Sequence, residues 1–358
     1  MGYLWPEITM HAAATLKPLV KAWLILGMVM IFMQIILGGI TRLTGSGLSI
    51  TKWDIVTGTI PPLNAAQWNE QFELYKQTPQ YQKINQGMAL EKFKWIFFWE
   101  YAHRLWARSM GFVFLIPLVI FWVKGFLTKT LKTDLVIVFI LSGIVGFFGW
   151  IMVASGLVNR PWVNAYKLSI HLGLALLALC YLFWTFLKAA SGSINKLIYP
   201  GSKKVSLIFL VLVSIQVLLG GMMSGMKAAL MYPTFPKMGL HWIDPVVLNG
   251  SSWQMKHFVD YDVYSFLPAL VQLLHRSMAI AILVLFVIVL IKWKIDILKW
   301  IGLILSAQIL LGIFTLINSI GIIPVSLGVL HQGVGIMLLL SAVRWYFESS
   351  DLVINKRH

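Results

Sequence analysis

Long apolar segments without a charged residue run through this chain of 358 residues. Hydrophobic residues make up 59% of the sequence and charged residues only 12%, which is far less polar than a soluble domain. About 20 consecutive apolar residues are enough to cross the hydrocarbon core of a bilayer. Uncharged segments of this kind are 22–40, 135–159, 168–187 and 205–226. We therefore expect a multi-pass membrane protein whose first apolar segment is a retained helix, because no small-residue cleavage site follows it.

The remaining apolar sequence accounts for four further helices. Residues 300–343 form an uncharged stretch that is too long for one helix, and Asn318, Gly321 and Pro324 are expected to break it into two. Two other spans begin at Trp95 and near Phe266, and each carries charge only in its first turns. We therefore predict an all-α membrane protein with eight transmembrane helices.

The positive charge of the chain indicates its orientation. A formal net charge of +16 would suggest nucleic-acid binding in a soluble protein, but here the charges lie in loops, so we expect no nucleic-acid partner. Short loops at 124–134, 188–204 and 292–299 hold ten lysines, whereas those on the other side hold only Arg160 and Lys167. Because positive residues concentrate on the cytoplasmic side, both termini are expected to be cytoplasmic.

The chain has the pattern of a tandem duplication. The segment Gln-Ile-Ile-Leu-Gly-Gly at 34–39 is matched by Gln-Val-Leu-Leu-Gly-Gly at 216–221, an offset of 182 residues. The dipeptide His-Arg occurs on the second helix of each half, and a further histidine occurs on the fourth. We expect two four-helix bundles, 1–190 and 191–358, related by a pseudo-twofold axis along the membrane normal.

Four histidines form the second constraint on the fold. They lie at similar depth, roughly 9–14 Å below the outer surface for a rise of about 1.5 Å per residue. An ionisable side chain inside a bilayer is costly and usually functional. A single such histidine could be a packed core residue or part of a proton relay, but duplicated pairs favour two bis-histidine haem sites. The four are His103, His171, His275 and His331.

One acidic residue breaks the duplication. Glu100 precedes His103 by three residues, so both project from one face of their helix, and its equivalent in the second half is Gln272. A carboxylate beside a haem can take a proton or stabilise a cation, whereas an amide cannot exchange protons at neutral pH. We infer that the first half carries out chemistry and the second carries electrons. The alternative is an interfacial charge that suits the start of a helix.

Other residues near the outer surface suggest contacts with a porphyrin. Arginines suit the anionic propionates of a haem, with snorkelling to lipid headgroups as the alternative. The glycine pairs of the repeat could admit a flat macrocycle or serve helix packing. His241 and His257 lie in the second long outer loop, where solvated histidines are common, and their role is left open. The arginines in question are Arg42, Arg104, Arg108 and Arg276.

At these residues the sequence resembles a known family, the haem A synthases of mitochondria and many Gram-negative bacteria. The resemblance spans nearly the whole chain and is looser from 249 to 263. The matching segments are GGITRLTGSGLS at 38–49, TGTIPPLN at 57–64, YKQTP at 75–79, WEYAHR at 99–104, VASGL at 153–157 and YPTFPKMG at 232–239. A cysteine pair in the first outer loop, found in another branch of the family, is missing, since Cys180 is the only cysteine.

The resemblance implies an activity. Such enzymes oxidise the C8 methyl group of haem O to a formyl group by successive hydroxylations, which gives haem A for cytochrome oxidase. His103 and His171 resemble the ligands of the substrate haem, with Arg104 and Arg42 beside it. His275 and His331 resemble the ligands of a haem b cofactor, with Arg276 beside it. Glu100 occupies the place of the functionally required glutamate.

The family also implies partners and a location. We expect haem O to come from a haem O synthase, the farnesyltransferase, and an electron donor or acceptor whose identity is open; a homo-oligomer is possible. A bacterial inner membrane is favoured over a mitochondrial one by the short N-terminal segment. The outer loop at 41–94 is expected to fold over the substrate site, with short helices at Ala65–Lys76 and 90–99.

Two other functions fit parts of the pattern. A di-haem cytochrome b that only transfers electrons would account for the four histidines but not for the Glu100/Gln272 difference or the long first loop. A transporter would account for the internal repeat, but transporters usually place broken helices and charges near the bilayer centre. Conversion of added haem O would separate the enzyme from the cytochrome, and a colourless protein would favour the transporter.

Overall fold

The computed structural model describes residues 16–53, 57–158, 160–190 and 201–350. Regular structure in these ranges is helical, apart from one isolated bridge between Met238 and His241. Eight of the described helices are long and apolar enough to cross a membrane, which confirms the prediction of an all-α multi-pass protein. Both ends of the chain, which we predict to be cytoplasmic, lie outside the described residues, as does Lys196.

The eight long helices have the expected order. They are α1 (Pro18–Leu43), α4 (Leu90–Val123), α5 (Lys129–Gly156), α6 (Ala165–Ala190), α7 (Ser202–Gly225), α10 (Phe266–Lys292), α11 (Asp296–Ile317) and α12 (Val325–Glu348). The predicted break in the uncharged stretch falls between α11 and α12. There Gly321 adopts a φ of 72°, which glycine tolerates best, and Pro324 precedes the first residue of α12.

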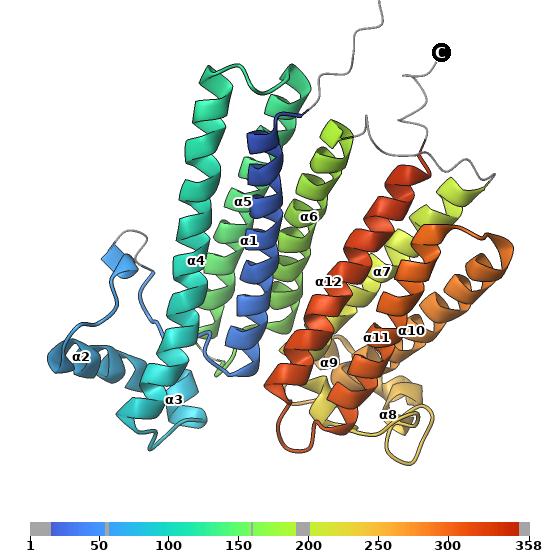
Figure 1. Ribbon diagram of the computed structural model, residues 1–358. Helices are drawn as coiled ribbons and strands as arrows, with labels where there is room; N and C mark the ends of the chain where they lie inside the picture. The colour runs from blue at the N-terminus through green and yellow to red at the C-terminus, as the bar shows by residue number, and fades with distance from the viewer. Residues whose placement is uncertain (1–15, 54–56, 159, 191–200, 351–358) are drawn as a thin grey trace, which may run out of the picture.

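Short helices occupy the two long outer loops. The first loop holds η1 (Thr57–Thr59), α2 (Ala65–Lys76) and α3 (Pro79–Lys83). The second holds η3 (Ala228–Leu230), α8 (Pro245–Leu248), η4 (Gly250–Ser252) and α9 (Met255–Val259). Figure 1 shows α2, α3, α8 and α9 together at one end of the molecule, opposite the connection from α4 to α5. Helix α2 has the predicted bounds and begins at a side-chain cap, because Asn64 accepts a hydrogen bond from the Gln67 amide.

The separate short helix predicted at 90–99 is wrong. These residues form the first turns of α4, a single helix of 34 residues, so the first outer loop runs from 44 to 89. The reason is tertiary packing: Phe93 and Phe97 are buried against the loop, and the rings of Phe72 and Phe93 stack with centroids 5.0 Å apart. Packing against the apolar side chains of α2 therefore stabilises the first turns of α4 as part of the same helix.

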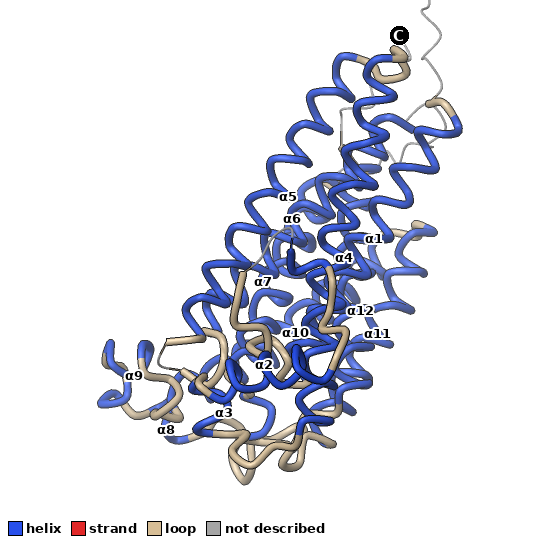
Figure 2. The backbone as a smooth tube through the Cα atoms, turned by 90° about the vertical axis from the view of Figure 1, so that its left-hand side faces the viewer, coloured by secondary structure: helices blue, strands red, loops and turns tan. Residues whose placement is uncertain are grey.

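The long helices form two groups of four. Figure 1 shows α1, α4, α5 and α6 on one side and α7, α10, α11 and α12 on the other. Figure 2, turned by 90°, shows all eight running roughly parallel to one long axis. Contacts between the groups come mainly from α6 on α7 and from α1 on α12, two pairs that the duplication relates to each other. The domain boundary at 190 stays a prediction, because the connection at 191–200 is outside the described residues.

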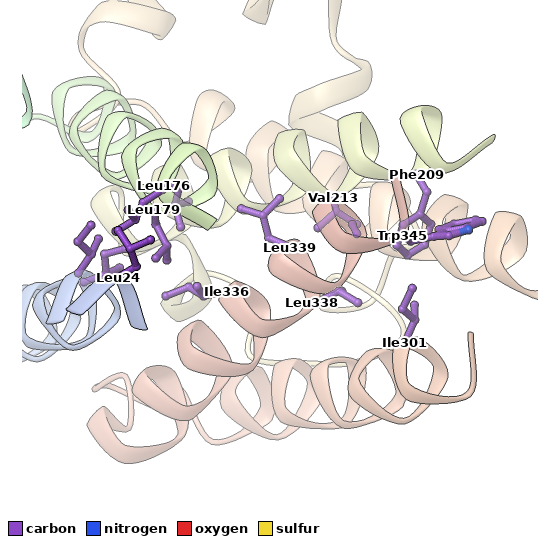
Figure 3. Close-up of a cluster of buried hydrophobic side chains, with 14 of the residues drawn as sticks. Leu24, Leu176, Leu179, Phe209, Val213, Ile301, Ile336, Leu338, Leu339 and Trp345 are labelled. Atoms are coloured by element: carbon purple, nitrogen blue, oxygen red, sulfur yellow. The ribbon is translucent and has the colours of Figure 1, made fainter. Parts of the chain in front are cut away.

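A continuous apolar core joins the two groups. Figure 3 shows Leu24 of α1 and Leu179 of α6 at one end of a buried cluster that continues through α12 to Trp345 beside Phe209 of α7. The ring centroids of Phe209 and Trp345 lie 5.6 Å apart. The centre of the molecule is therefore built from α1, α6, α7 and α12.

Small residues let these central helices approach closely. A Cβ atom at Gly225 would lie 2.7 Å from the Cα atom of Ala165 and 3.3 Å from Leu168. At the repeat-related contact, a Cβ atom at Gly328 would lie 2.7 Å from Leu43. Leu43 and Gly225 are equivalent positions, so the large and small partners are exchanged between the two contacts. Such close approaches at small residues are the usual basis of helix association in membranes.

The first prediction concerns this contact. Gly225→Leu should destabilise the protein by about 1–3 kcal/mol, because the new side chain overlaps the backbone of α6. Thermal unfolding in detergent should show a lower midpoint. Gly146→Ala is the matched control, since a Cβ atom there meets nothing within 4 Å. Equal midpoints for Gly225→Leu and the unchanged protein would contradict this account of the interface.

Candidate functional site

The four predicted histidines line one continuous cavity near the outer end of the helices. Its volume is about 1550 Å³, and Glu100 also lines it. Typical small-molecule sites have volumes of about 300–1,000 Å³, so this cavity has room for more than one ordinary ligand. The structure thus brings together residues that the sequence separates by more than two hundred positions.

Each histidine ring lies against a glycine of a neighbouring helix. A Cβ atom at the glycine would come within 2.9–3.4 Å of the imidazole Cε1 atom in every case. The pairs are Gly38 with His103, Gly149 with His171, Gly220 with His275, and Gly312 with His331. Sequence reasoning identified Gly38 and Gly220 but missed the other two. Gly149 and Gly312 are repeat-related positions 163 residues apart, which was the available signal. Both helices are apolar throughout, so a single glycine does not stand out in them.

The second glycine of each pair has a different role. A Cβ atom at Gly39 would overlap the side chain of Gln332 on α12, and one at Gly221 would lie 3.2 Å from Leu172 on α6. Leu172 and Gln332 are repeat-related, each following a predicted ligand histidine. The second glycine of each pair packs two helices together, as one of the two interpretations predicted, whereas the first makes room for an imidazole, a role that neither interpretation included.

Glutamine amides contact three of the four imidazoles. The Nε2 atom of Gln34 lies 3.3 Å from Nε2 of His103 and donates to the His103 carbonyl at 3.2 Å. Gln216 repeats both contacts with His275, at 3.3 and 3.0 Å. Gln308 lies 3.4 Å from Nε2 of His331. Contacts of this kind fix the orientation of a ring that binds a metal.

His171 differs from the other three. The residue equivalent to Gln308 in the first half is Val145, whose side chain has no amide group to contact the imidazole. Gly335 leaves room for the Gln308 side chain, because a Cβ atom there would lie 3.0 Å from the amide nitrogen. Its counterpart is Ala175. The two histidine pairs are therefore not identical, and the difference falls in the first half.

The geometry of the histidine pairs fits a haem held through two imidazoles. The rings of His275 and His331 have centroids 6.4 Å apart. With metal–imidazole bonds of about 2 Å, two imidazoles on opposite sides of one iron place their centroids about 6 Å apart. In all four histidines Nδ1 is buried and makes no hydrogen bond with a side chain of the described residues. The described part of the chain contains no cluster of three or more His, Cys, Asp or Glu able to hold a metal.

Glu100 is buried and connects α4 to the first outer loop. Only 2% of the residue is exposed. Its Oε2 accepts hydrogen bonds from the Ser49 hydroxyl at 2.7 Å and from the Ile50 amide at 2.8 Å. Its Oε1 accepts a hydrogen bond from Arg104 at 2.6 Å within an ion pair. The carboxylate therefore borders the cavity while it anchors the loop.

Arg104 and Arg276 hold equivalent loop carbonyls. Arg104 donates to the carbonyls of Ile50 and Lys52, at 3.1 and 2.9 Å. Arg276 donates to those of Tyr232 and Thr234, at 3.1 and 2.8 Å. Residues 50 and 52 are 182 positions before 232 and 234, so the duplication extends into the outer loops. In the second half Gln272 replaces the carboxylate and donates to Tyr232 at 3.2 Å.

Arg42 joins the two halves directly. It donates to the carbonyl of Ser224, which is its own repeat equivalent, and to that of Gly225 at 3.0 Å. Both carbonyls belong to the last turn of α7, where a cation is favoured by the helix dipole. Arg42 therefore lies close to the axis of the duplication. Arg42, Arg104, Arg108 and Arg276 all line the cavity.

The two loop histidines lie away from the cavity wall. His241 is exposed, and His257 contacts the Ser252 carbonyl through Nδ1 at 2.7 Å and packs on Tyr264. Neither is among the described residues that line the cavity. The second outer loop is instead fixed by Tyr261, whose hydroxyl accepts a hydrogen bond from the Ala165 amide at 2.8 Å. Burial raises the pKa of Tyr261, so its hydroxyl stays protonated.

Eight helices able to cross a membrane, with four histidines lining one cavity between them, define a class: multi-pass membrane proteins with a histidine-lined site inside the helix bundle. Comparison with known proteins narrows this class. Residues 21–343 match the family described as Cytochrome oxidase assembly protein (COX15-CtaA). The chain belongs to this family, the haem A synthases.

Individual relatives match over almost the whole chain. The protein named "Heme A synthase" of Nitrosospira multiformis is 38% identical over 351 residues, which cover 95% of each chain. That of Parvibaculum lavamentivorans is 36% identical and covers 91% of this chain and 92% of its own. That of Brucella anthropi is 39% identical and covers 91% of both. The resemblance found in the sequence is confirmed.

The second prediction tests the anchoring role of Glu100. Glu100→Ala should release the start of the first outer loop, because it leaves the Ile50 amide and the Arg104 guanidinium without their buried partner; breaking a buried ion pair costs about 3–5 kcal/mol. Hydrogen exchange should become faster at Ile50. Glu73→Ala is the control, since its ion pair with Lys76 is exposed and worth about 0–1 kcal/mol. Unchanged protection at Ile50 would show that the loop is held by other contacts.

Proposed function

We infer that this protein is a haem A synthase, a membrane oxidoreductase that converts haem O into haem A during cytochrome oxidase assembly. The observation that carries this conclusion is a match at 36–39% identity over at least 91% of the chain to proteins of that name. The paired imidazoles, which suit a tetrapyrrole, support it. The comparisons give no support to an electron-transferring di-haem cytochrome.

We propose a division of labour between the halves. His103 and His171 bind the substrate, haem O, and His275 and His331 bind a haem b cofactor. The support is the asymmetry of the duplication, since Glu100 borders the first pair and the uncharged Gln272 occupies the equivalent place beside the second. A proton acceptor is needed where a carbon–hydrogen bond is broken, which favours the first half as the place where the C8 methyl group becomes a formyl group.

The cofactor supplies redox chemistry, and the protein supplies orientation, electrostatics and proton transfer. Glu100 is proposed to act through Oε2, which faces Ser49. When Oε2 takes up a proton, the Ser49 hydroxyl still has an acceptor, because the Ile96 carbonyl lies 3.3 Å away. Oε1 remains paired with Arg104, so the carboxyl group keeps its position while its charge changes.

The arginines are proposed to bind the anionic propionates. Arg42 and Arg276 each use their terminal nitrogens on loop or helix carbonyls, while their Nε atoms are buried and have no hydrogen-bond partner among the described residues. Each guanidinium thus retains a donor for a carboxylate. We assign Arg42 and Arg104 to the substrate and Arg276 to the cofactor. Arg104 acts mainly by holding the outer loop over the site.

We further propose a bacterial cytoplasmic membrane with both termini in the cytoplasm. The lysine-rich short loops and the long outer loops occupy opposite ends of the helices, as the positive-inside rule requires. The substrate carries an isoprenoid tail and is too apolar to diffuse through water. A haem O synthase in the same bilayer is therefore the proposed source, with a separate protein as electron donor or acceptor.

The third prediction tests the activity and the carboxylate together. Membranes containing the protein should convert added haem O into haem A, as shown by mass analysis of extracted pigments. Glu100→Gln, which copies the second half, should lower this conversion by roughly 10²-fold or more, because a general acid–base group typically contributes 10²–10⁴-fold. The variant should keep its haem b. Full activity in Glu100→Gln would refute the proton-transfer role, and no conversion by the unchanged protein would refute the function.

The fourth prediction concerns the cofactor ligands. His275→Leu or His331→Leu should abolish the low-spin bis-histidine signal of haem b, because leucine offers no nitrogen to the iron. Optical and electron paramagnetic resonance spectra of the purified protein measure this. His257→Leu is the control, since His257 does not line the cavity. A low-spin spectrum that survives in both variants would show that residues other than His275 and His331 bind the cofactor.

A further inference from the structure

The two halves differ in how their second and third long helices meet. In the first half, α4 packs on α1 and α2 while α5 packs on α6. Between α4 and α5, the rings of Phe114 and Phe139 stack with centroids 6.4 Å apart and planes 8° from parallel. This aromatic pair bridges the two helices, and Phe139 is exposed on the outside of the bundle.

The second half replaces one of these rings with a glycine. The equivalents of Phe114 and Phe139 are Phe286 and Gly302. A Cβ atom at Gly302 would lie 3.0 Å from the ring of Phe286, which is buried. Helix α10 therefore approaches α11 directly, and the two helices pack together. At this position the two halves therefore differ by an exchange of phenylalanine for glycine.

Small residues line the space on the outer side of the aromatic pair. A Cβ atom at Gly111, Gly143 or Gly146 would meet nothing within 4 Å, and all three line the cavity. We call the space bounded by Gly111, Phe114, Phe139, Gly143 and Gly146 the α4–α5 crevice. In the second half the equivalents of its three glycines are Leu283, Ser306 and Ile309, so two large apolar side chains stand where the first half has none.

The α4–α5 crevice leads to the first histidine pair. Gly149 follows Gly146 by about one turn, and the ring of His171 lies against it. The imidazole of His171, whose Nδ1 is buried, also lines the cavity at this end of the crevice. From Gly149 to Phe139 the crevice extends about 15 Å toward the bilayer centre.

The side of the crevice that faces away from the histidines borders the apolar, exposed surface of the bundle. The side chains beside its glycines point outward and are exposed, with exposed fractions of 66% for Phe112 and 56% for Phe147. The exposed surface of this part of the bundle is apolar and would face hydrocarbon chains. A ligand that enters here can therefore have a long apolar chain but needs no water-filled path.

We propose that the α4–α5 crevice binds the isoprenoid tail of haem O while its macrocycle lies between His103 and His171. This proposal rests on the proposed function and deepens it, since it identifies the feature by which the protein tells its substrate from its cofactor. Haem O has the tail and fits the first half. Haem b lacks the tail and suits the second half, where Leu283 and Ile309 occupy the equivalent space.

The test fills the crevice in graded steps. Gly146 is changed to Ala, Val and Ile, the last of which copies the second half, and Gly143→Leu is combined with Gly146→Ile. Each purified protein is saturated with haem O and haem b and washed in detergent, and the retained pigments are extracted and identified by mass. Retained haem O should fall with side-chain volume, by roughly tenfold or more in the double variant, while haem b stays constant. Ser306→Leu, at the position equivalent to Gly143, should retain both pigments.

The outcomes separate this proposal from the proposed function. Haem O retention that does not depend on side-chain volume would overturn the assignment of the crevice, and so would a parallel loss of both haems. The smallest variant keeps the test decisive, because alanine at Gly146 has open space around its Cβ atom and should fold. Conversion of haem O by the unchanged protein is measured separately, so a failed crevice leaves the enzyme assignment intact.

Discussion

The close approach of an imidazole ring to a helix backbone is the contact on which the rest of this structure depends. Each of the four histidines needs a glycine opposite it, since any Cβ atom there would come within 2.9–3.4 Å of the ring. Those glycines fix the distance between the helices and the depth of the rings at once. One layer of four imidazoles follows, with His275 and His331 at a separation suited to a single iron.

The duplicated scaffold becomes useful where the two copies differ. The first half has Glu100, Val145 and Phe139. At the equivalent positions the second half has Gln272, Gln308 and Gly302. The second half keeps the amide contact to His331 and the closed α10–α11 pair, which suits a cofactor that stays bound. The first half has the acid and lacks a side-chain amide beside His171, which agrees with the proposal that it takes the substrate.

Much of the fold could be predicted because a bilayer leaves few choices. Backbone groups in hydrocarbon must be paired within the segment, so each long uncharged stretch had to be a helix. Helix α2 also has the bounds that were predicted from the composition of the loop. The start of α4 was not predicted, because the burial of Phe93 against Phe72 joins side chains 21 positions apart, a contact that no local helix pattern specifies. The roles of Gly149 and Gly312 were missed for the same reason.

The sequence by itself determined the class of fold, the duplication, the four histidines and the acid that breaks the symmetry. These are properties of hydropathy, spacing and side-chain chemistry. Only the tertiary structure decided what those residues touch. Arg104 and Arg276 hold loop carbonyls, Arg42 caps a helix of the other half, and Phe139 of α5 stacks on Phe114 of α4. Such contacts depend on distances between helices, and these are set by pairs of side chains that no local pattern specifies.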